Sequence, residues 1–161
     1  MYKRQEEGDG DGDEGKDGDG VNSPPAAWLA TANQWGEINS NYGKLIFDGI
    51  YYYQYDSVFQ ELQANPDSRR ACMVYNRPSI QVEYDENGKN DFICTNAVTY
   101  YIRDNYLHCV VQMRSNDVIF GYRNDYAWQK EVQSRLLEDL NATGMELKLC
   151  LLYTSPSPRD Y

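Results

Sequence analysis

Two runs of β-forming residues, separated by a two-residue turn, constrain the fold of this chain most. Residues 97–102 and 106–114 are rich in Val, Tyr, Ile and Thr, as β-strands are. Asp104-Asn105 between them suits the tight turn of a β-hairpin. The sequence therefore predicts an antiparallel hairpin at the centre of the fold.

Reactive and phosphate-binding residue types flank this hairpin. Pairing of its strands carries Cys94 back towards Arg114, and a thiol near a positive charge is held partly as thiolate, the nucleophilic form. Arg114 and Ser115 together supply the forked and hydroxyl donors that bind phosphate. Gly121 allows a close backbone approach, and Asp125 follows where a helix would begin. The competing interpretation makes Cys94 a small buried side chain and Asp125 a helix N-cap.

A longer combination of motifs resembles a known family. Residues 65–70 read NPDSRR, Cys94 follows about two dozen residues later, and RSNDVIFG begins at Arg114. From Tyr42 to about Leu149 the chain resembles the thymidylate synthase family. The resemblance implies an α+β fold, a mixed sheet with packed helices, present here as an incomplete domain. It also implies a homodimer with an active site shared between subunits.

The resemblance assigns the nucleophile and the phosphate ligands. Cys94 resembles the nucleophile that adds to C6 of a pyrimidine ring, so a pyrimidine deoxynucleoside monophosphate is the implied substrate. Arg114 and Ser115 resemble phosphate ligands. Arg69 and Arg70 resemble the pair that reaches the same phosphate across the dimer; without the resemblance, two adjacent basic residues in a loop would be expected only to be solvated.

Other residues are implied near the base and the folate. Tyr42, in the sequence NSNYG, resembles the tyrosine-glycine segment close to the family's active site. Asp117 and Gly121 sit where the family contacts the pyrimidine and the folate. The co-substrate implied is 5,10-methylenetetrahydrofolate, and the reaction implied is one-carbon transfer to C5 of the pyrimidine.

Asp125 departs from the thymidylate synthase pattern, which has an Asn reading the base edge. Uracil shows a carbonyl at C4 and an N3–H, which suit an amide, whereas cytosine reverses both groups. A carboxyl group that is protonated, or shares a proton with the ring, matches cytosine instead. Asp here, and the wording RSNDVIFGYRNDYAW, resemble the viral-type deoxycytidylate hydroxymethylases of the family. The substrate predicted is dCMP; the alternatives are a thymidylate synthase acting on dUMP and a non-catalytic nucleotide-binding descendant.

The two ends of the chain resemble translated sequencing adapter rather than natural protein. Residues 1–5 (MYKRQ) and 150–161 (CLLYTSPSPRDY) resemble opposite strands of a transposase adapter, a natural Ser-Pro tail being the alternative for the second. Residues 6–27 open with a Gly- and acid-rich run that cannot bury apolar surface. This leaves 28–149 as the expected thymidylate synthase-like fragment.

The charge, the apolar runs and the cysteine spacing of the sequence limit which partners and compartments are expected. A formal net charge of −10 gives no electrostatic footprint for a nucleic acid polymer, although a few local arginines suffice for a nucleotide monomer. No apolar run approaches membrane-spanning length. The cysteines lack framework spacing, which favours reduced thiols in a cytoplasm, that of the host if the protein is viral. Neither a CxxC pair nor a His cluster indicates a metal site.

Hydrophobic periodicity and turn residues predict the other elements. A helix is expected over 50–64, with Tyr51, Tyr55, Val58 and Leu62 on one side and Asn65-Pro66 at its end. The remaining expectations are a loop with a short apolar segment over 28–47, a strand over 71–76, a turn over 86–89, a helix after Asp125 with a core stripe of Trp128, Val132, Leu136 and Leu140, a helix end at Thr143-Gly144, and a strand from 145.

Overall fold

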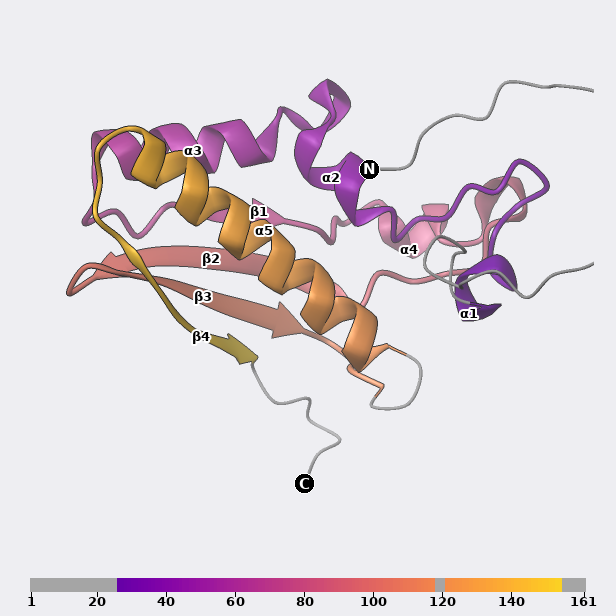
Figure 1. Cartoon of the computed structure of the whole chain (residues 1–161). Coiled ribbons are helices and arrows are strands. Elements are labelled where there is room, and N and C mark those ends of the chain that lie inside the picture. The colour runs from indigo at the N-terminus through magenta and orange to yellow at the C-terminus, as the bar shows by residue number, and fades with distance from the viewer. Residues whose placement is uncertain (1–25, 118–120, 155–161) are drawn as a thin grey trace, which may run out of the picture.

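The structure, a computed structural model, describes residues 26–117 and 121–154. It is an α+β fold with a four-stranded mixed sheet in the order β1-β2-β3-β4 and helices packed against it, as predicted (Figure 1). The first three strands are antiparallel neighbours, and β4 runs parallel to β3. The strands are β1 (Cys72–Val74), β2 (Thr95–Arg103), β3 (Tyr106–Met113) and β4 (Lys148–Thr154).

Strands β2 and β3 form the predicted hairpin. Arg103 pairs with Tyr106, so only two residues make the turn. Asp104 and Asn105 have φ angles of 50° and 63°. Positive φ at both central positions is the geometry of a type I′ turn, whose twist matches that of the paired strands. The turn chemistry therefore sets the register that the sequence predicted.

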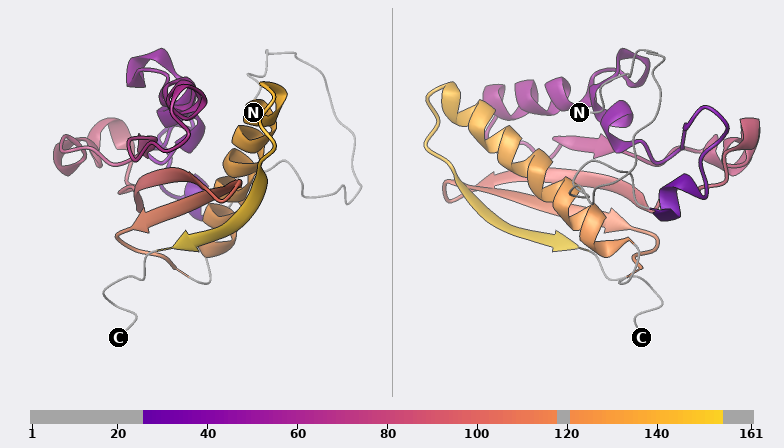
Figure 2. Two further views of the ribbon diagram at one scale, coloured as in Figure 1. Left: turned by 90° about the vertical axis from the view of Figure 1, so that its left-hand side faces the viewer. Right: turned by 45° about the vertical axis from the view of Figure 1, so that its right-hand side comes forward.

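Two helices cover one face of this sheet. Helix α5 (Tyr122–Ala142) crosses the sheet diagonally, and α3 (Gln54–Ala64) lies beside it near β1 (Figures 1 and 2). Along β2, fully buried side chains alternate with half-buried ones, which is the pattern of a sheet with one covered face. The shared core includes Val58, Leu62, Met73, Val98, Tyr100, Leu107, Val111, Val132, Leu136 and Leu140.

The helix predicted over 50–64 is shorter in the structure. A 3-10 turn, η1 (Gly49–Tyr51), comes first, and Tyr52 and Tyr53 then have φ angles of 65° and 47°. A left-handed backbone cannot continue a right-handed helix. The break places Tyr51 outside α3, and this part of the prediction is wrong.

Most other boundaries differ only by a few residues. The segment 28–47, predicted as loop plus apolar run, contains short helices, and β1 is shorter than the predicted 71–76. The turn predicted over 86–89 is a 3-10 turn. The short elements are α1 (Ala26–Leu29), α2 (Tyr42–Phe47), α4 (Ile80–Glu83) and η2 (Glu86–Gly88).

Helix α5 begins earlier than the sequence suggested. Its first residue is Tyr122 and its N-cap is Gly121, so Asp125 lies inside the first turn. Asp125 therefore does not cap the helix, and the competing interpretation of this residue fails. The helix ends at Ala142, and Gly144 follows with a φ of 97°, in agreement with the predicted end.

The buried stripe of α5 is more polar than predicted. Val132, Leu136 and Leu140 are buried as expected, whereas Trp128 is only partly buried. Gln129 and Gln133 are fully buried on the same face, with exposed fractions of 1% and 0%. Buried amides need hydrogen-bond partners or cost free energy, so each of these glutamines requires an explanation.

The last strand continues past the expected fragment boundary at 149. Strand β4 starts at Lys148 rather than at 145, and its residues 150–154 fall in the segment that resembles adapter. The rest of that segment, residues 155–161, lies outside the described residues, as do 1–25, which hold the other adapter-like end and most of the acidic segment 6–27.

Candidate active site

Cys94 and Arg114 meet at the open end of the hairpin. Thr95 pairs with Met113, and the backbone N–H of Arg114 then donates to the carbonyl of Cys94 at 2.9 Å. The guanidinium Nη2 of Arg114 lies 3.9 Å from the Cys94 sulfur. The predicted approach of thiol and guanidinium is confirmed, because strand register alone brings the two side chains together.

The Arg114 side chain is held in place by backbone carbonyls. Its Nε donates to Ile93 O at 2.9 Å, its Nη2 donates to Phe92 O at 2.8 Å, and its guanidinium carbon lies 4.7 Å from the centre of the Phe92 ring. Nη1 makes no hydrogen bond with the described residues, and the side chain is exposed. Arg114 therefore offers a fixed donor for an anion, next to the half-buried Ser115.

The pKa of Cys94 shifts in the direction opposite to the expectation. Burial raises the pKa of its thiol, and the neighbouring Arg114 only partly offsets this by favouring the thiolate. The carboxylates of Asp125, Asp91 and Asp117 raise the pKa further. The prediction that Arg114 holds Cys94 partly as thiolate is thus wrong for the net direction, since desolvation outweighs the nearby positive charge.

Asp125 and Tyr42 form the second half of the same site. Burial raises the pKa of the Asp125 carboxyl to about 6, and the nearby Tyr42 hydroxyl opposes the rise. Thr95 Oγ1 donates to the Tyr42 hydroxyl oxygen at 3.1 Å, which leaves the phenolic proton for another acceptor. Burial also raises the pKa of Tyr42, and the charges of Asp125 and Cys94 add to that rise. Cysteine, tyrosine and carboxyl therefore act on one another in a single site.

Hydrogen bonds between Asp91 and Asn39-Ser40 fasten the segment leading to Cys94 onto the segment leading to Tyr42. The Asp91 carboxylate accepts from the backbone N–H groups of Asn39 and Ser40, at 2.8 and 2.7 Å. The Asn39 amide donates in return to the Asp91 carbonyl at 2.9 Å. Sequence reasoning missed these hydrogen bonds, because an Asn and an Asp 52 positions apart carry no local signal.

Asp117 and Gly121 lie together at the start of α5. The Asp117 carbonyl accepts from the N–H groups of Gly121 and Tyr122, at 2.9 and 2.7 Å. A Cβ added at Gly121 would lie 3.4 Å from Asp125 Oδ2. The glycine thus leaves the Asp125 carboxyl without a side chain pressed against it. Residues 118–120 between these positions lie outside the described residues.

Arg69 and Arg70 do not join this site within one chain. The backbone N–H of Tyr100 donates to the carbonyl of Ala71, the residue after Arg70. Tyr100 is six positions along the chain from Cys94, so the arginine pair lies about 20 Å from Cys94. Arg70 pairs with Glu61 at 3.0 Å. Arg69 is exposed and makes no hydrogen bond or ion pair within the described part of the chain.

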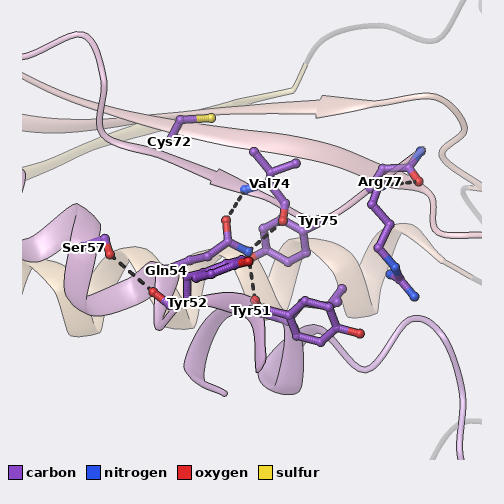
Figure 3. A pocket seen from close by; sticks show the side chains of 10 residues that line it. Tyr51, Tyr52, Gln54, Ser57, Cys72, Val74, Tyr75 and Arg77 are labelled. Carbon is purple, nitrogen blue, oxygen red and sulfur yellow. Dashed lines mark hydrogen bonds between the residues drawn. The ribbon is translucent and has the colours of Figure 1, made fainter. Parts of the chain in front are cut away.

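A larger pocket than the cavity beside Asp125 lies elsewhere in the described part of the chain. It has a volume of about 330 Å³ and is lined by residues of the segments 51–57 and 72–77 together with Leu45, none of them from the predicted site (Figure 3). In it, the Gln54 side chain accepts from Val74 N–H at 2.7 Å and donates to Val74 O at 2.8 Å (Figure 3). Gln54 thus satisfies the edge of β1 as a neighbouring strand would.

The described residues contain neither a metal-ligand cluster nor a membrane-spanning helix. Within 26–117 and 121–154, no group of three or more His, Cys, Asp or Glu side chains could hold a metal ion. No helix in the described part of the chain has the length and apolar character needed to cross a bilayer.

Comparison with known proteins decides the family. The sequence model of the thymidylate synthase family matches residues 22–152. The chain belongs to the thymidylate synthase family. The predicted resemblance is confirmed, and the Cys94–Arg114 pair lies inside the matched region.

Phage proteins are among the similar members of this family. The deoxycytidylate 5-hydroxymethyltransferases of phages T4, T2 and T6 are each 56% identical to this chain over 118 residues. The match covers 73% of this chain and 48% of each phage protein, so the chain spans about half of their length. A solved structure, thermostable thymidylate synthase A from Bacillus subtilis, aligns with 63% of this chain and 35% of its own, at 23% identity and a TM-score of 0.41.

Proposed function

We propose that the complete protein transfers a one-carbon unit from 5,10-methylenetetrahydrofolate to C5 of dCMP and forms 5-hydroxymethyl-dCMP. The observation that carries this proposal is Asp125, a half-buried carboxyl with a pKa near 6 in the same site as Cys94. The phage relatives at 56% identity are named for action on deoxycytidylate. The chemistry of one residue and the similarity of the chain thus favour the same substrate.

A carboxyl with a raised pKa suits the edge of cytosine. Its protonated oxygen donates to the bare N3, and its other oxygen accepts from the C4 amine. Asp125 keeps its proton at higher pH than an exposed aspartate, because burial disfavours its charged form. Uracil would meet this group with an N3–H and a carbonyl, which leaves buried polar groups unpaired.

Cys94 is the group assigned to covalent catalysis. Its thiolate adds to C6 of the cytosine ring, which makes C5 nucleophilic towards the methylene carbon of the folate. Loss of the C5 proton and of tetrahydrofolate leaves an exocyclic methylene, water adds to it, and elimination of Cys94 releases the product. Because burial raises the pKa of Cys94 in this chain, we propose that the thiolate forms only as it attacks C6. The thiol proton is lost to solvent, and the nearby Arg114 guanidinium favours the charged sulfur.

The phosphate site is proposed to be shared between two subunits. Arg114 and Ser115 would bind the phosphate next to Cys94. Arg69 and Arg70 lie about 20 Å away along β2, so they would serve the site of the other subunit of a homodimer. The half-buried outer face of β2 is consistent with such packing.

The same proposed function indicates which residues bind the folate and in which compartment the protein acts. Asp117 and Gly121 lie next to Asp125 at the start of α5, and we assign them to the folate side of the pocket, with Asp117 also near the base. The described cysteines are all free thiols, which fits a reducing compartment. We therefore propose action in the cytoplasm, that of the host for a phage-encoded protein.

Trapping of a covalent complex tests this function. Fluorine at C5 of 5-fluoro-dCMP cannot leave as a cation, so the reaction should stop with nucleotide and folate carbon both bound to the protein. We expect intact-mass spectrometry of the complete protein to show one such adduct, and peptide mapping to place it on Cys94. Cys94→Ala should give none. An adduct on Cys72, or none with the wild-type protein, would contradict the assignment.

A further inference from the structure

Gln129 is a buried amide with no partner. It is 1% exposed, and neither Nε2 nor Oε1 makes a hydrogen bond within the described residues. Burial raises the pKa of the Tyr75 hydroxyl, and the Gln129 side chain, close to that hydroxyl but without hydrogen-bond geometry, opposes the rise. The next glutamine on this face, Gln133, differs because its Nε2 donates to Leu107 O at 2.9 Å.

This amide shares a small cavity with Asp125. Gln129 and Asp125 are four positions apart on α5 and therefore lie on one face of the helix. Both line a cavity of about 10 Å³, together with Asn116, Tyr122 and Tyr126 among others. The Oδ1 atom of Asn116 is also buried without a partner. The cavity has about the volume that one water molecule needs. Its wall is mainly apolar, with Val111 and Met113 in it, and the Asn116, Asp125 and Gln129 side chains supply the polar partners.

We propose that Gln129 is a positioning residue for Asp125 and acts through one water molecule held in this cavity. The water accepts from Gln129 Nε2 and donates to Asn116 Oδ1 and to one oxygen of the Asp125 carboxyl. It makes three hydrogen bonds, the usual number for a buried water. Gln129 Nε2 and Asn116 Oδ1 then have a partner, which removes the cost of leaving these two buried atoms unpaired.

The water sets which oxygen of Asp125 carries the proton. A carboxyl group has about four lone-pair sites. The Tyr42 hydroxyl and the water would fill two of them, and the proposed contacts with N3 and the C4 amine of cytosine would fill the others. An oxygen that already accepts from water is the less basic one, so the proton resides on the other oxygen, where it can be donated to N3.

The titratable groups around Asp125 come from three elements. Tyr42 lies close to it from α2, Cys94 lies close enough for its own pKa to be raised by Asp125, from the segment before β2, and Tyr122 and Tyr126 share its cavity from α5 itself. Only burial and Tyr42 contribute to the shift of the Asp125 pKa. A substitution of Gln129 alters none of these titratable groups. A change in the Asp125 pKa on that substitution would therefore report the loss of the water.

Carbon NMR of the Asp125 carboxyl in this chain tests the proposal without any substrate. The signal is assigned by its loss in Asp125→Asn, and its titration midpoint is measured. Gln129→Met keeps the volume but removes the donor that favours the ionised carboxylate, so the midpoint should rise by about one pH unit. The matched variant Gln133→Met, also buried on α5, should leave the midpoint unchanged. Equal midpoints in wild type and Gln129→Met would overturn the proposal.

A second variant keeps the test valid if Gln129→Met fails to fold. Asn116→Leu removes the other anchor of the same water from a half-buried position, and the midpoint should again rise; no change would count against the water. The consequence for base selection rests on the proposed function: Gln129→Met in the complete protein should lower kcat/KM for dCMP about tenfold. A shifted midpoint without dCMP turnover in the wild type would keep this inference and reject the function.

Discussion

Replacement of Asp125 by Asn should reverse the base preference of the complete protein from dCMP to dUMP. An amide held with its oxygen towards N3 and its NH2 group towards C4 matches the N3–H and C4 carbonyl of uracil, and cytosine would require the amide to be turned over. Sites that mismatch buried hydrogen-bonding groups discriminate by factors of about 10⁴ or more. We expect the ratio of kcat/KM for dCMP over dUMP to fall at least about a thousandfold.

The pH dependence of this selection supplies an internal control. Asp125 has a pKa of about 6, raised by burial, so its protonated form is lost as pH rises through 6. The ratio of dCMP to dUMP affinity in the wild type should therefore decline above that pH. Both nucleotides carry the same phosphate, so its titration affects both affinities equally and does not change their ratio. Asp125→Asn carries no ionisable group there, and its ratio should stay flat.

Two outcomes would remove Asp125 from its role as the base reader. One is a wild-type protein that already prefers dUMP. The other is an Asp125→Asn protein that still prefers dCMP at every pH tested. Asp139, a carboxylate in the same helix and outside the site, provides the matched control. Asp139→Asn should leave the preference unchanged.

Two inactive variants should restore activity when their subunits are mixed. Cys94→Ala removes the nucleophile and should lower turnover by more than about 10⁴-fold. The double change Arg69→Ala and Arg70→Ala removes two charge-assisted phosphate contacts and should lower kcat/KM by about 10² to 10³-fold. In a mixed dimer, one site then receives an intact Cys94 from one subunit and intact arginines from the other.

Random exchange of subunits predicts how much activity returns. Half of the dimers are mixed and each carries one complete site, so an equal mixture should recover about one quarter of the wild-type rate. The exchange is brought about by mild denaturation and refolding together. Recovery no greater than the sum of the separate variants would mean that the arginines do not act across the dimer. Glu61→Gln should retain activity, since its ion pair with the exposed Arg70 is weak and the amide oxygen of Gln can still accept from the Ser68 hydroxyl.

The sequence predicts the hairpin and the Cys94–Arg114 contact because both depend on local chemistry. Asp104 and Asn105 tolerate the positive φ angles of the turn, and the turn fixes the register that aligns the two site residues. The family motifs then point to the remaining positions. Features with a short-range cause were therefore accessible before the structure.

Features that depend on tertiary packing were not accessible. The net rise of the Cys94 pKa comes from burial, which no residue spacing reports. A glutamine in an amphipathic helix is normally expected to face solvent, yet the Gln129 side chain is buried against the sheet. The helix break at Tyr52 and Tyr53 is likewise invisible, because aromatic residues rarely take positive φ.

The most direct test of the central claim is product analysis with the complete protein. It is incubated with 5,10-methylenetetrahydrofolate and equal amounts of dCMP and dUMP, and the products are identified by mass. We predict 5-hydroxymethyl-dCMP, with dUMP left unchanged. Formation of dTMP from dUMP, with dCMP left unchanged, would contradict both the substrate and the role given to Asp125.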